Sequence, residues 1–106
     1  MTITHRAFFG TGERAFALTD PMVIELERLT DTGIGALFAR MARNDFHLSH
    51  LIEVIRLGLI GGGTNPEEAA RLVDTYARQR PIGELLPLAL DVLDARWSGT
   101  EVKAND

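Results

Sequence analysis

Three side chains that could bind a metal ion follow one another at intervals of three residues. They are His47, His50 and Glu53, and this spacing places them near one another on a helix. Two imidazoles and a carboxylate can hold zinc. However, the order is not His-Glu-x-x-His, and the only other histidine, His5, stands far away in the sequence. We therefore favour solvated or capping roles for the histidines and expect no metal and no cofactor.

Other residue types capable of catalysis lack the partners that they would need. Ser49 and Ser98 are the only serines, and neither stands in a Gly-x-Ser-x-Gly turn. The chain has no cysteine, which excludes a thiol nucleophile, a thiolate zinc site and disulfides. Asp91 and Asp94 alternate with leucine and valine, as on the solvated edge of a helix. The sequence therefore predicts a protein that is not an enzyme; an enzyme subunit with a metal at His47 and His50 is the least favoured hypothesis.

Three glycines and a threonine at residues 61–64 could be taken for a phosphate-binding loop. Such a loop needs a lysine directly before the threonine and a strand before the glycines, whereas here a glycine and a helical apolar pattern precede them. We interpret the glycines as the end of a helix, because glycine readily adopts the left-handed conformation found there. Asn65 then predicts the N-cap of the next helix, with Pro66 as its first residue and Glu68 completing a capping box.

Composition and charge narrow the classes of function. The chain has 106 residues, of which 45% are hydrophobic and 25% are charged, as in a single globular domain. Its net charge of −4 argues against general binding of nucleic acid. We recognise no secretory signal and no apolar run of about 18 residues, so we expect no membrane contact and a cytoplasmic location.

Alternating apolar residues on both sides of a glycine-containing turn predict a β-hairpin over residues 3–19. A lone hairpin is marginally stable in water, so it should pack on helices or on another chain. Phe8 and Phe9 point to opposite faces of this hairpin. One of them should meet the core, and the other is either covered by the helices or left as a docking point for a partner.

About five short helices are predicted over residues 21–97. Asp20 is the expected cap of the first, before Pro21. The third, from His47 or Leu48 to Ile60, is apolar nearly all round, which predicts a central position, and its Gly58 should mark the close approach of a neighbour. The expected apolar faces, in chain order, are Met22, Val23, Leu26 and Leu29; Ile34, Leu37, Phe38, Met41 and Ala42; Leu48, Leu51, Ile52, Ile55 and Leu59; Ala69, Leu72, Val73, Tyr76 and Ala77; and Ile82, Leu85, Leu86, Ala89, Leu93 and Trp97.

The predicted fold class is α+β, mostly α, with an N-terminal β-hairpin followed by about five short helices packed as a compact bundle. Residues 1–99 are expected to form a single globular domain, and residues 100–106 a flexible C-terminal tail. Pro87 should kink the last helix if that helix begins at Ile82.

The third and fourth predicted helices also allow a helix-turn-helix interpretation. A recognition helix needs side chains that bind bases and phosphates. The fourth helix instead carries more acidic residues than arginines, namely Glu67, Glu68 and Asp74 against Arg71 and Arg78. A small helical DNA-binding or transcriptional regulatory domain is therefore the alternative hypothesis, and it requires duplex binding that weakens with salt.

Four segments carry a resemblance to a known family. They are Glu25–Leu29 (Glu-Leu-Glu-Arg-Leu), Thr32–Leu37 (Thr-Gly-Ile-Gly-Ala-Leu), Ile55–Gly63 (Ile-Arg-Leu-Gly-Leu-Ile-Gly-Gly-Gly) and Arg80–Ile82 (Arg-Pro-Ile). With a hairpin before them and a leucine-rich helix ending in Trp-Ser-Gly after them, the chain resembles the small tail assembly chaperones of tailed phages and gene transfer agents. The resemblance runs over almost the whole chain, and its most specific piece ends at the three glycines.

This resemblance implies a non-enzymatic assembly factor. Its implied partner is the long tape-measure protein, which it would keep soluble until tail-tube subunits polymerise around it; the tail-tube protein is a second implied partner, and a homo-oligomer is allowed. Apolar helix stripes of the tape measure would be buried in apolar grooves of the chaperone. The implied location is the cytoplasm of the bacterial host cell and not the mature particle. The resemblance supplies no catalytic motif, no cofactor and no site residues.

Overall fold

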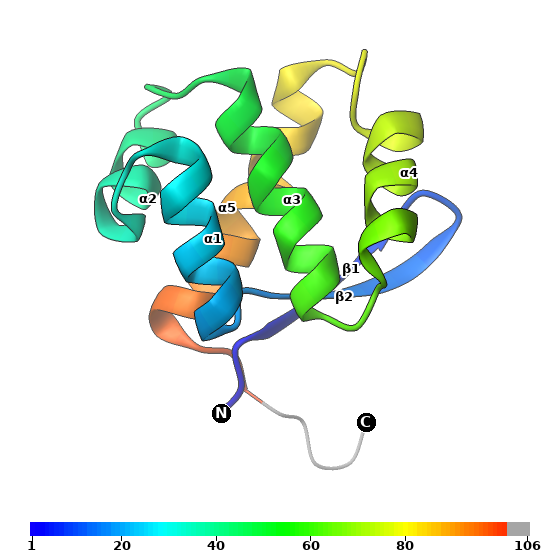
Figure 1. Cartoon of the computed structure of the whole chain (residues 1–106), viewed down its shortest axis with the longest axis horizontal. Helices are drawn as coiled ribbons and strands as arrows, with labels where there is room; N and C mark the ends of the chain where they lie inside the picture. The colour runs from blue at the N-terminus through cyan, green and yellow to red at the C-terminus, as the bar shows by residue number, and fades with distance from the viewer. Residues whose placement is uncertain (102–106) are drawn as a thin grey trace.

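The computed structural model describes residues 1–101, and Figure 1 shows its architecture. A two-stranded antiparallel sheet comes first, and within the described residues five helices follow it. The elements are β1 (Thr4–Phe9), β2 (Gly12–Ala17), α1 (Asp20–Thr30), α2 (Ile34–Ala42), α3 (Leu48–Gly61), α4 (Pro66–Tyr76) and α5 (Ile82–Ser98). The predicted fold class is confirmed. No helix in this part of the chain is long and apolar enough to cross a lipid bilayer.

The hairpin closes through a two-residue loop, Gly10 and Thr11. Phe9 pairs with Gly12 at the loop, and the register continues to Thr4 opposite Ala17. Gly10 has φ of 74°, and a positive φ at the first loop residue is typical of a type II′ turn, which matches the twist of the strands. Phe9 faces the core and packs edge to face on Phe16, as predicted for one of the two adjacent phenylalanines.

The third helix, α3, crosses the middle of the molecule, as predicted, with α1 and α2 on one side and α4 on the other (Figure 1). It contacts β2 and the helices α1, α4 and α5. Its buried residues are Leu51, Ile52, Val54, Ile55, Leu57, Gly58 and Leu59. Leu48, which the periodicity assigned to the buried face, is 52% exposed because it is the first residue of the helix and lies at its open end.

Gly58 lets α3 approach α5 and the hairpin, as predicted. A Cβ added at this position would lie 3.1 Å from Cγ1 of Val92 and 3.4 Å from the ring of Phe16. Both neighbours are buried, so neither has free space to move into. The weak helix propensity of glycine is therefore offset by close packing.

The glycines at the end of α3 act differently from the prediction. Gly61 still belongs to the helix, Gly62 has φ of −81°, and only Gly63 has a positive φ, of 115°. A Cβ added at Gly61 or Gly62 would overlap the carbonyl oxygen of Ala17 or Ala15, respectively. The first two glycines are thus required for contact between α3 and the backbone of β2, and the left-handed conformation explains Gly63 alone.

Three predictions for α1 and α2 are corrected. Asp20 is the first residue of α1 and not its cap, and its Oδ1 accepts a hydrogen bond of 2.8 Å from Nη2 of Arg96. Leu29, expected in the core, is 40% exposed, while Thr30 is buried and its hydroxyl donates to the carbonyl of Leu26. Ala42 of α2 is also exposed, because it stands in the last, uncovered position of that helix.

The N-terminus of α4 forms only one of the two hydrogen bonds of the predicted capping box. Oδ1 of Asn65 accepts a hydrogen bond of 2.8 Å from the backbone N–H of Glu68, as expected. The Glu68 carboxylate pairs with Arg71 and does not return to Asn65. The predicted inward face is confirmed in four buried residues, Ala69, Leu72, Val73 and Ala77, with Tyr76 partly buried.

The last helix, α5, runs as one element from Ile82 through Pro87 to Ser98. Its buried residues are Leu85, Ala89, Val92, Leu93 and Ala95. Ile82 and Trp97, expected on the buried face, are instead 47% and 63% exposed. The helix packs on α3, α2 and β1 at the same time, so a single 3.6-residue stripe does not describe its buried surface.

The chain returns to the hairpin directly after α5. Thr2 and Thr100 form an antiparallel bridge in which each N–H donates to the other residue's carbonyl, over 2.8 and 2.7 Å. Thr100 was expected to be the first residue of a flexible tail, but in the structure it is bound to the N-terminal segment. Residues 102–106 of the predicted tail lie outside the described residues.

Candidate partner-binding surfaces

The three residues considered for a metal do not share a site. The rings of His47 and His50 pack edge to face with centroids 5.0 Å apart, while Oε2 of Glu53 pairs with Nε of Arg56 at 2.6 Å. Partial burial, together with the charges of His47 and Arg40, holds the pKa of His50 below its usual value. Within residues 1–101, no three His, Asp or Glu side chains converge in a way that could hold a metal ion.

The two carboxylates considered for acid–base chemistry are also separate. Oδ2 of Asp91 lies 3.7 Å from Nε2 of His5, across the gap between α5 and β1. Asp94 accepts a hydrogen bond from the hydroxyl of Ser98, one turn further along α5. Because the two acids turn to different partners, they do not form a pair.

Two exposed arginines, Arg71 of α4 and Arg78 just after its end, are paired with acidic residues of α4. Arg71 binds the carboxylate of Glu68, and Nε of Arg78 lies 2.8 Å from Oδ1 of Asp74. The hydrogen bond from Arg71 holds the pKa of Glu68 below its usual value, as the one from Arg28 does for Glu25 on α1. An arginine that already neutralises a neighbour contributes little to phosphate binding, so α4 gives the helix-turn-helix hypothesis no support.

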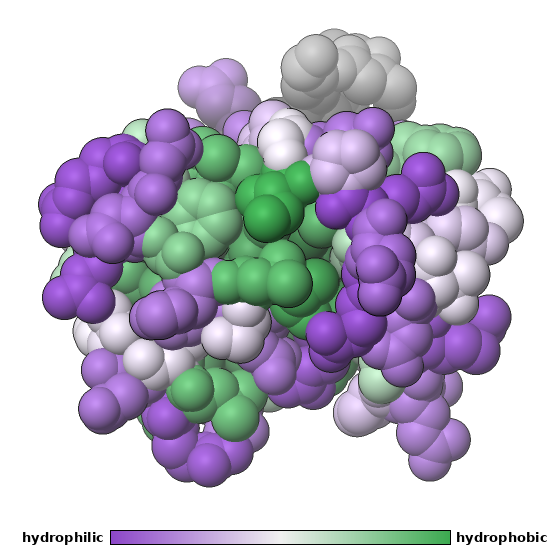
Figure 2. All heavy atoms as spheres, turned by 90° about the horizontal axis from the view of Figure 1, so that it is seen from above, coloured by the Kyte–Doolittle hydropathy of each residue, from purple (hydrophilic) through white to green (hydrophobic). Residues whose placement is uncertain are grey.

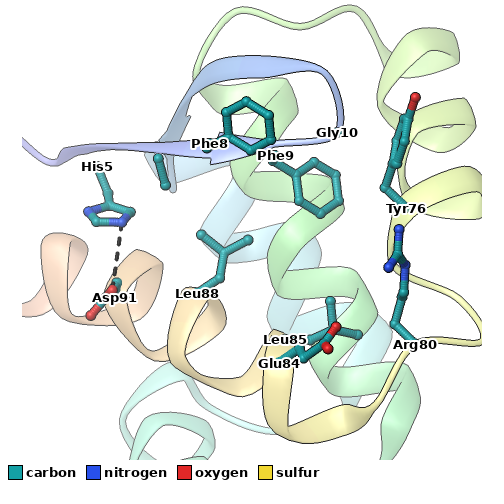
Figure 3. A pocket seen from close by; sticks show the side chains of 11 residues that line it. His5, Phe8, Phe9, Gly10, Tyr76, Arg80, Glu84, Leu85, Leu88 and Asp91 are labelled. Carbon is teal, nitrogen blue, oxygen red and sulfur yellow. Dashed lines mark ion pairs between the residues drawn. The ribbon is translucent and has the colours of Figure 1, made fainter.

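An open groove lies between β1 and the first half of α5, and Figure 3 shows it from close by. Its volume is about 360 Å³. Leu85 and Leu88 of α5 form an apolar floor, and Tyr76 closes the end near the hairpin loop. Ala7 of β1 also lines the groove. The charged residues that line it are Glu84 and Asp91 from α5, Arg80 from the segment before α5, and His5 from β1.

Above this groove, the outer edge of β1 is largely unpaired. Because a two-residue loop makes Phe9 and Gly12 a hydrogen-bonded pair, the alternation directs the N–H and C=O groups of Thr4, Arg6 and Phe8 away from β2. Thr100 confirms this direction, since its hydroxyl donates to the carbonyl of Thr4 over 2.8 Å. Among residues 1–101, nothing forms a hydrogen bond with the outward backbone groups of Arg6 or Phe8.

Phe8 is the most exposed aromatic residue of the described chain. Its side chain is 73% exposed, on the face of the hairpin opposite to Phe9. The sequence left open whether the helices would cover this second phenylalanine. They do not, so the residue remains available as a contact for another molecule.

A second apolar surface lies at the end of the molecule where α3 and α5 begin. Figure 2 shows hydrophobic residues gathered in the middle of this face, with hydrophilic residues around them. Leu48 and Ile82, the first residues of the two helices, are about half exposed there. We call this surface the end face. At the other end of α5, exposed Trp97 packs on Phe38 with ring centroids 5.9 Å apart.

Comparison with known proteins gives one family. The family model described as "Phage tail tube protein, GTA-gp10" matches residues 2–99, which is nearly the whole of the described chain. No curated protein and no solved structure matches the chain.

Proposed function

The chain belongs to this family of phage and gene transfer agent tail proteins, and from that premise we propose that it is a non-enzymatic tail assembly chaperone. It binds the tape-measure protein and keeps it soluble in the host cytoplasm until the tail tube forms. No cofactor and no nucleic acid take part. The observation that carries the proposal is the exposed apolar surface of this small tail-family domain, above all the end face.

The physical basis is the burial of apolar surface that both proteins would otherwise expose to water. A long helical protein with apolar stripes aggregates unless the stripes are covered, and covering them is favourable by roughly 25 cal/mol per Å² of buried apolar area. Leu48 and Ile82 are about half exposed at the two helix starts of the end face. Figure 2 shows that the apolar middle of this face has a hydrophilic rim, which is the arrangement that accepts an amphipathic helix. The rim keeps the chaperone itself in solution.

Co-expression with the long, helix-rich protein encoded nearby tests this function. We expect that protein to be insoluble alone and to co-elute with many copies of the present chain in size-exclusion chromatography with light scattering. If it is soluble alone and elutes apart from this chain, the proposal is wrong.

A pair of variants locates the contact. The double substitution Leu48→Ser with Ile82→Ser removes the apolar centre of the end face and should reduce the recovered complex strongly. Ile24→Ser removes an apolar residue that is 66% exposed on α1 and serves as the matched control. An equal loss in both variants would show that binding is not confined to the end face.

A tail-tube subunit is the second candidate, because the family description uses those words. The composition of purified particles separates the two. A tube subunit stays in the finished tail in many copies, whereas a chaperone leaves before the particle is complete.

A further inference from the structure

We propose that the outer edge of β1 binds an extended segment of the tape-measure protein, which adds as a third strand above α5. This inference rests on the proposed function, since that function names the partner. The inference goes beyond the proposed function because it assigns a second binding mode, through the backbone, at the outer edge of β1.

The hydrogen-bonding groups of the edge define the form of the ligand. Arg6 and Phe8 present alternating N–H and C=O groups to the side away from β2. A helix cannot satisfy them, because its own backbone groups are already paired, whereas an extended chain can. The molecule itself uses this edge in that way, because Thr100 pairs with Thr2 and binds the carbonyl of Thr4.

The same contacts limit the length of the segment. Thr100 occupies the edge at Thr4, and the hairpin turns away at Gly10. The open stretch is therefore centred on Ala7, with one pair of outward backbone groups on each side of it. A short strand fits here, and a long one would collide with Thr100.

The groove below the edge defines the side chains. In an added strand, alternate side chains point toward the floor formed by Leu85 and Leu88, where there is about 360 Å³ of open volume. A medium-sized apolar residue fits that space. The rim carries two carboxylates, Glu84 and Asp91, and one arginine, Arg80. Because Oδ2 of Asp91 already lies 3.7 Å from Nε2 of His5, Glu84 is the carboxylate that favours a lysine or arginine next to the apolar residue. On the opposite face, the ring of Phe8 is available to the remaining side chains.

Amide hydrogen exchange of the full chain, alone and in its co-purified complex with the tape-measure protein, tests this. In the free protein the amides of Arg6 and Phe8 should exchange fast, while those of Ala7 and Phe9, which donate to β2, are protected. In the complex we expect the exchange rates of the Arg6 and Phe8 amides to fall by about tenfold or more. A complex in which these two amides still exchange fast would overturn the proposal of an added third strand, but it would not contradict the chaperone function. Failure to form any complex would overturn both.

A second copy of this chain is the competing occupant of the edge. If a second copy binds there, the amides of Arg6 and Phe8 should be protected without the tape-measure protein, and this protection should rise with the concentration of the chain. That result would overturn the assignment to the tape-measure protein.

A proline substitution tests the backbone contact directly. Arg6→Pro removes an N–H that points away from β2, so the ladder of the hairpin stays intact. Arg6→Ala removes the same side chain and keeps the donor, which makes it the matched control. We expect Arg6→Pro to bind the partner about tenfold more weakly than Arg6→Ala, with equal midpoints of thermal unfolding. Equal binding by the two variants would overturn the proposal.

Discussion

The two edges of the hairpin meet the rest of the molecule in opposite ways. The edge of β2 is closed by α3, whose Gly61 and Gly62 touch the carbonyl oxygens of Ala17 and Ala15. The edge of β1 is closed only at its beginning, by Thr100, and is open at Arg6 and Phe8. Exposed edges invite pairing with another chain, and proteins usually cover or charge them. Here the covering of one edge by a helix, and not of the other, indicates which side of the sheet is structural and which is left for a partner.

The largest effect should come from Gly61→Ala, at the closed edge. The added Cβ would overlap a backbone oxygen of β2, so either α3 or the hairpin must move, and we expect a loss of about 3 kcal/mol in the free energy of unfolding. Urea denaturation followed by circular dichroism measures it. Gly12→Ala is the control on the hairpin, because an added Cβ there has no neighbour within 4 Å. A Gly61→Ala variant as stable as the control would show that α3 does not close this edge.

The next largest loss of stability is expected from Gly10→Ala, in the loop that joins β1 to β2. Gly10 has φ of 74°, and a Cβ there would lie 3.0 Å from the ring of Tyr76. The backbone strain and the contact together should lower the free energy of unfolding by about 2 kcal/mol. Thr11→Ala, an exposed position in the same loop, should change it by less than about 0.5 kcal/mol. If the two variants are equally stable, the turn is not the type that the structure shows.

A smaller effect is expected from Thr100→Val, at the beginning of the β1 edge, which is the part that the molecule itself covers. The substitution keeps the shape of the side chain and removes the hydroxyl that donates to the carbonyl of Thr4. A loss of about 1 kcal/mol is expected from the free energy of unfolding. Thr75→Val on the exposed face of α4 is the matched control and should change stability little. An unchanged Thr100→Val variant would mean that the hydroxyl of Thr100 does not help to hold this segment on the edge of β1.

Much of the fold could be predicted from local sequence, because each helix carries its own signals. Asn65 and Pro66 begin α4, period-two alternation locates the hairpin, and the apolar surface of α3 predicts its central position. Periodicity failed at Leu29 and Trp97, because the face that a helix buries depends on which neighbours surround it. At the end of α1 the buried side chain is Thr30 and not Leu29, and α5 divides its buried surface among several elements.

The candidate surfaces were harder to predict than the fold. The opposite orientations of Phe8 and Phe9 follow from alternation, and the structure confirms them. The groove does not follow, because it joins β1 to α5, which is more than half of the chain away in sequence. The roles of Gly61 and Gly62 were also missed, since a glycine that ends a helix and a glycine that touches a strand look the same in a sequence.

The smallest change in stability is expected from Phe8→Ala, at the open edge itself. The ring of Phe8 is 73% exposed, so its loss removes few contacts and should alter the free energy of unfolding by less than about 0.5 kcal/mol. The adjacent Phe9→Ala removes a buried ring that packs on Phe16 and Tyr76, and should cost about 3 kcal/mol or more. Denaturation of the two variants side by side therefore measures how unequal the two faces of one strand are. A loss above about 1 kcal/mol for Phe8→Ala would show that its ring supports the fold of the monomer, and the exposed phenylalanine would then be no evidence for a partner. A neutral Phe8→Ala variant that also binds the tape-measure protein less well would leave recognition as the function of this side chain.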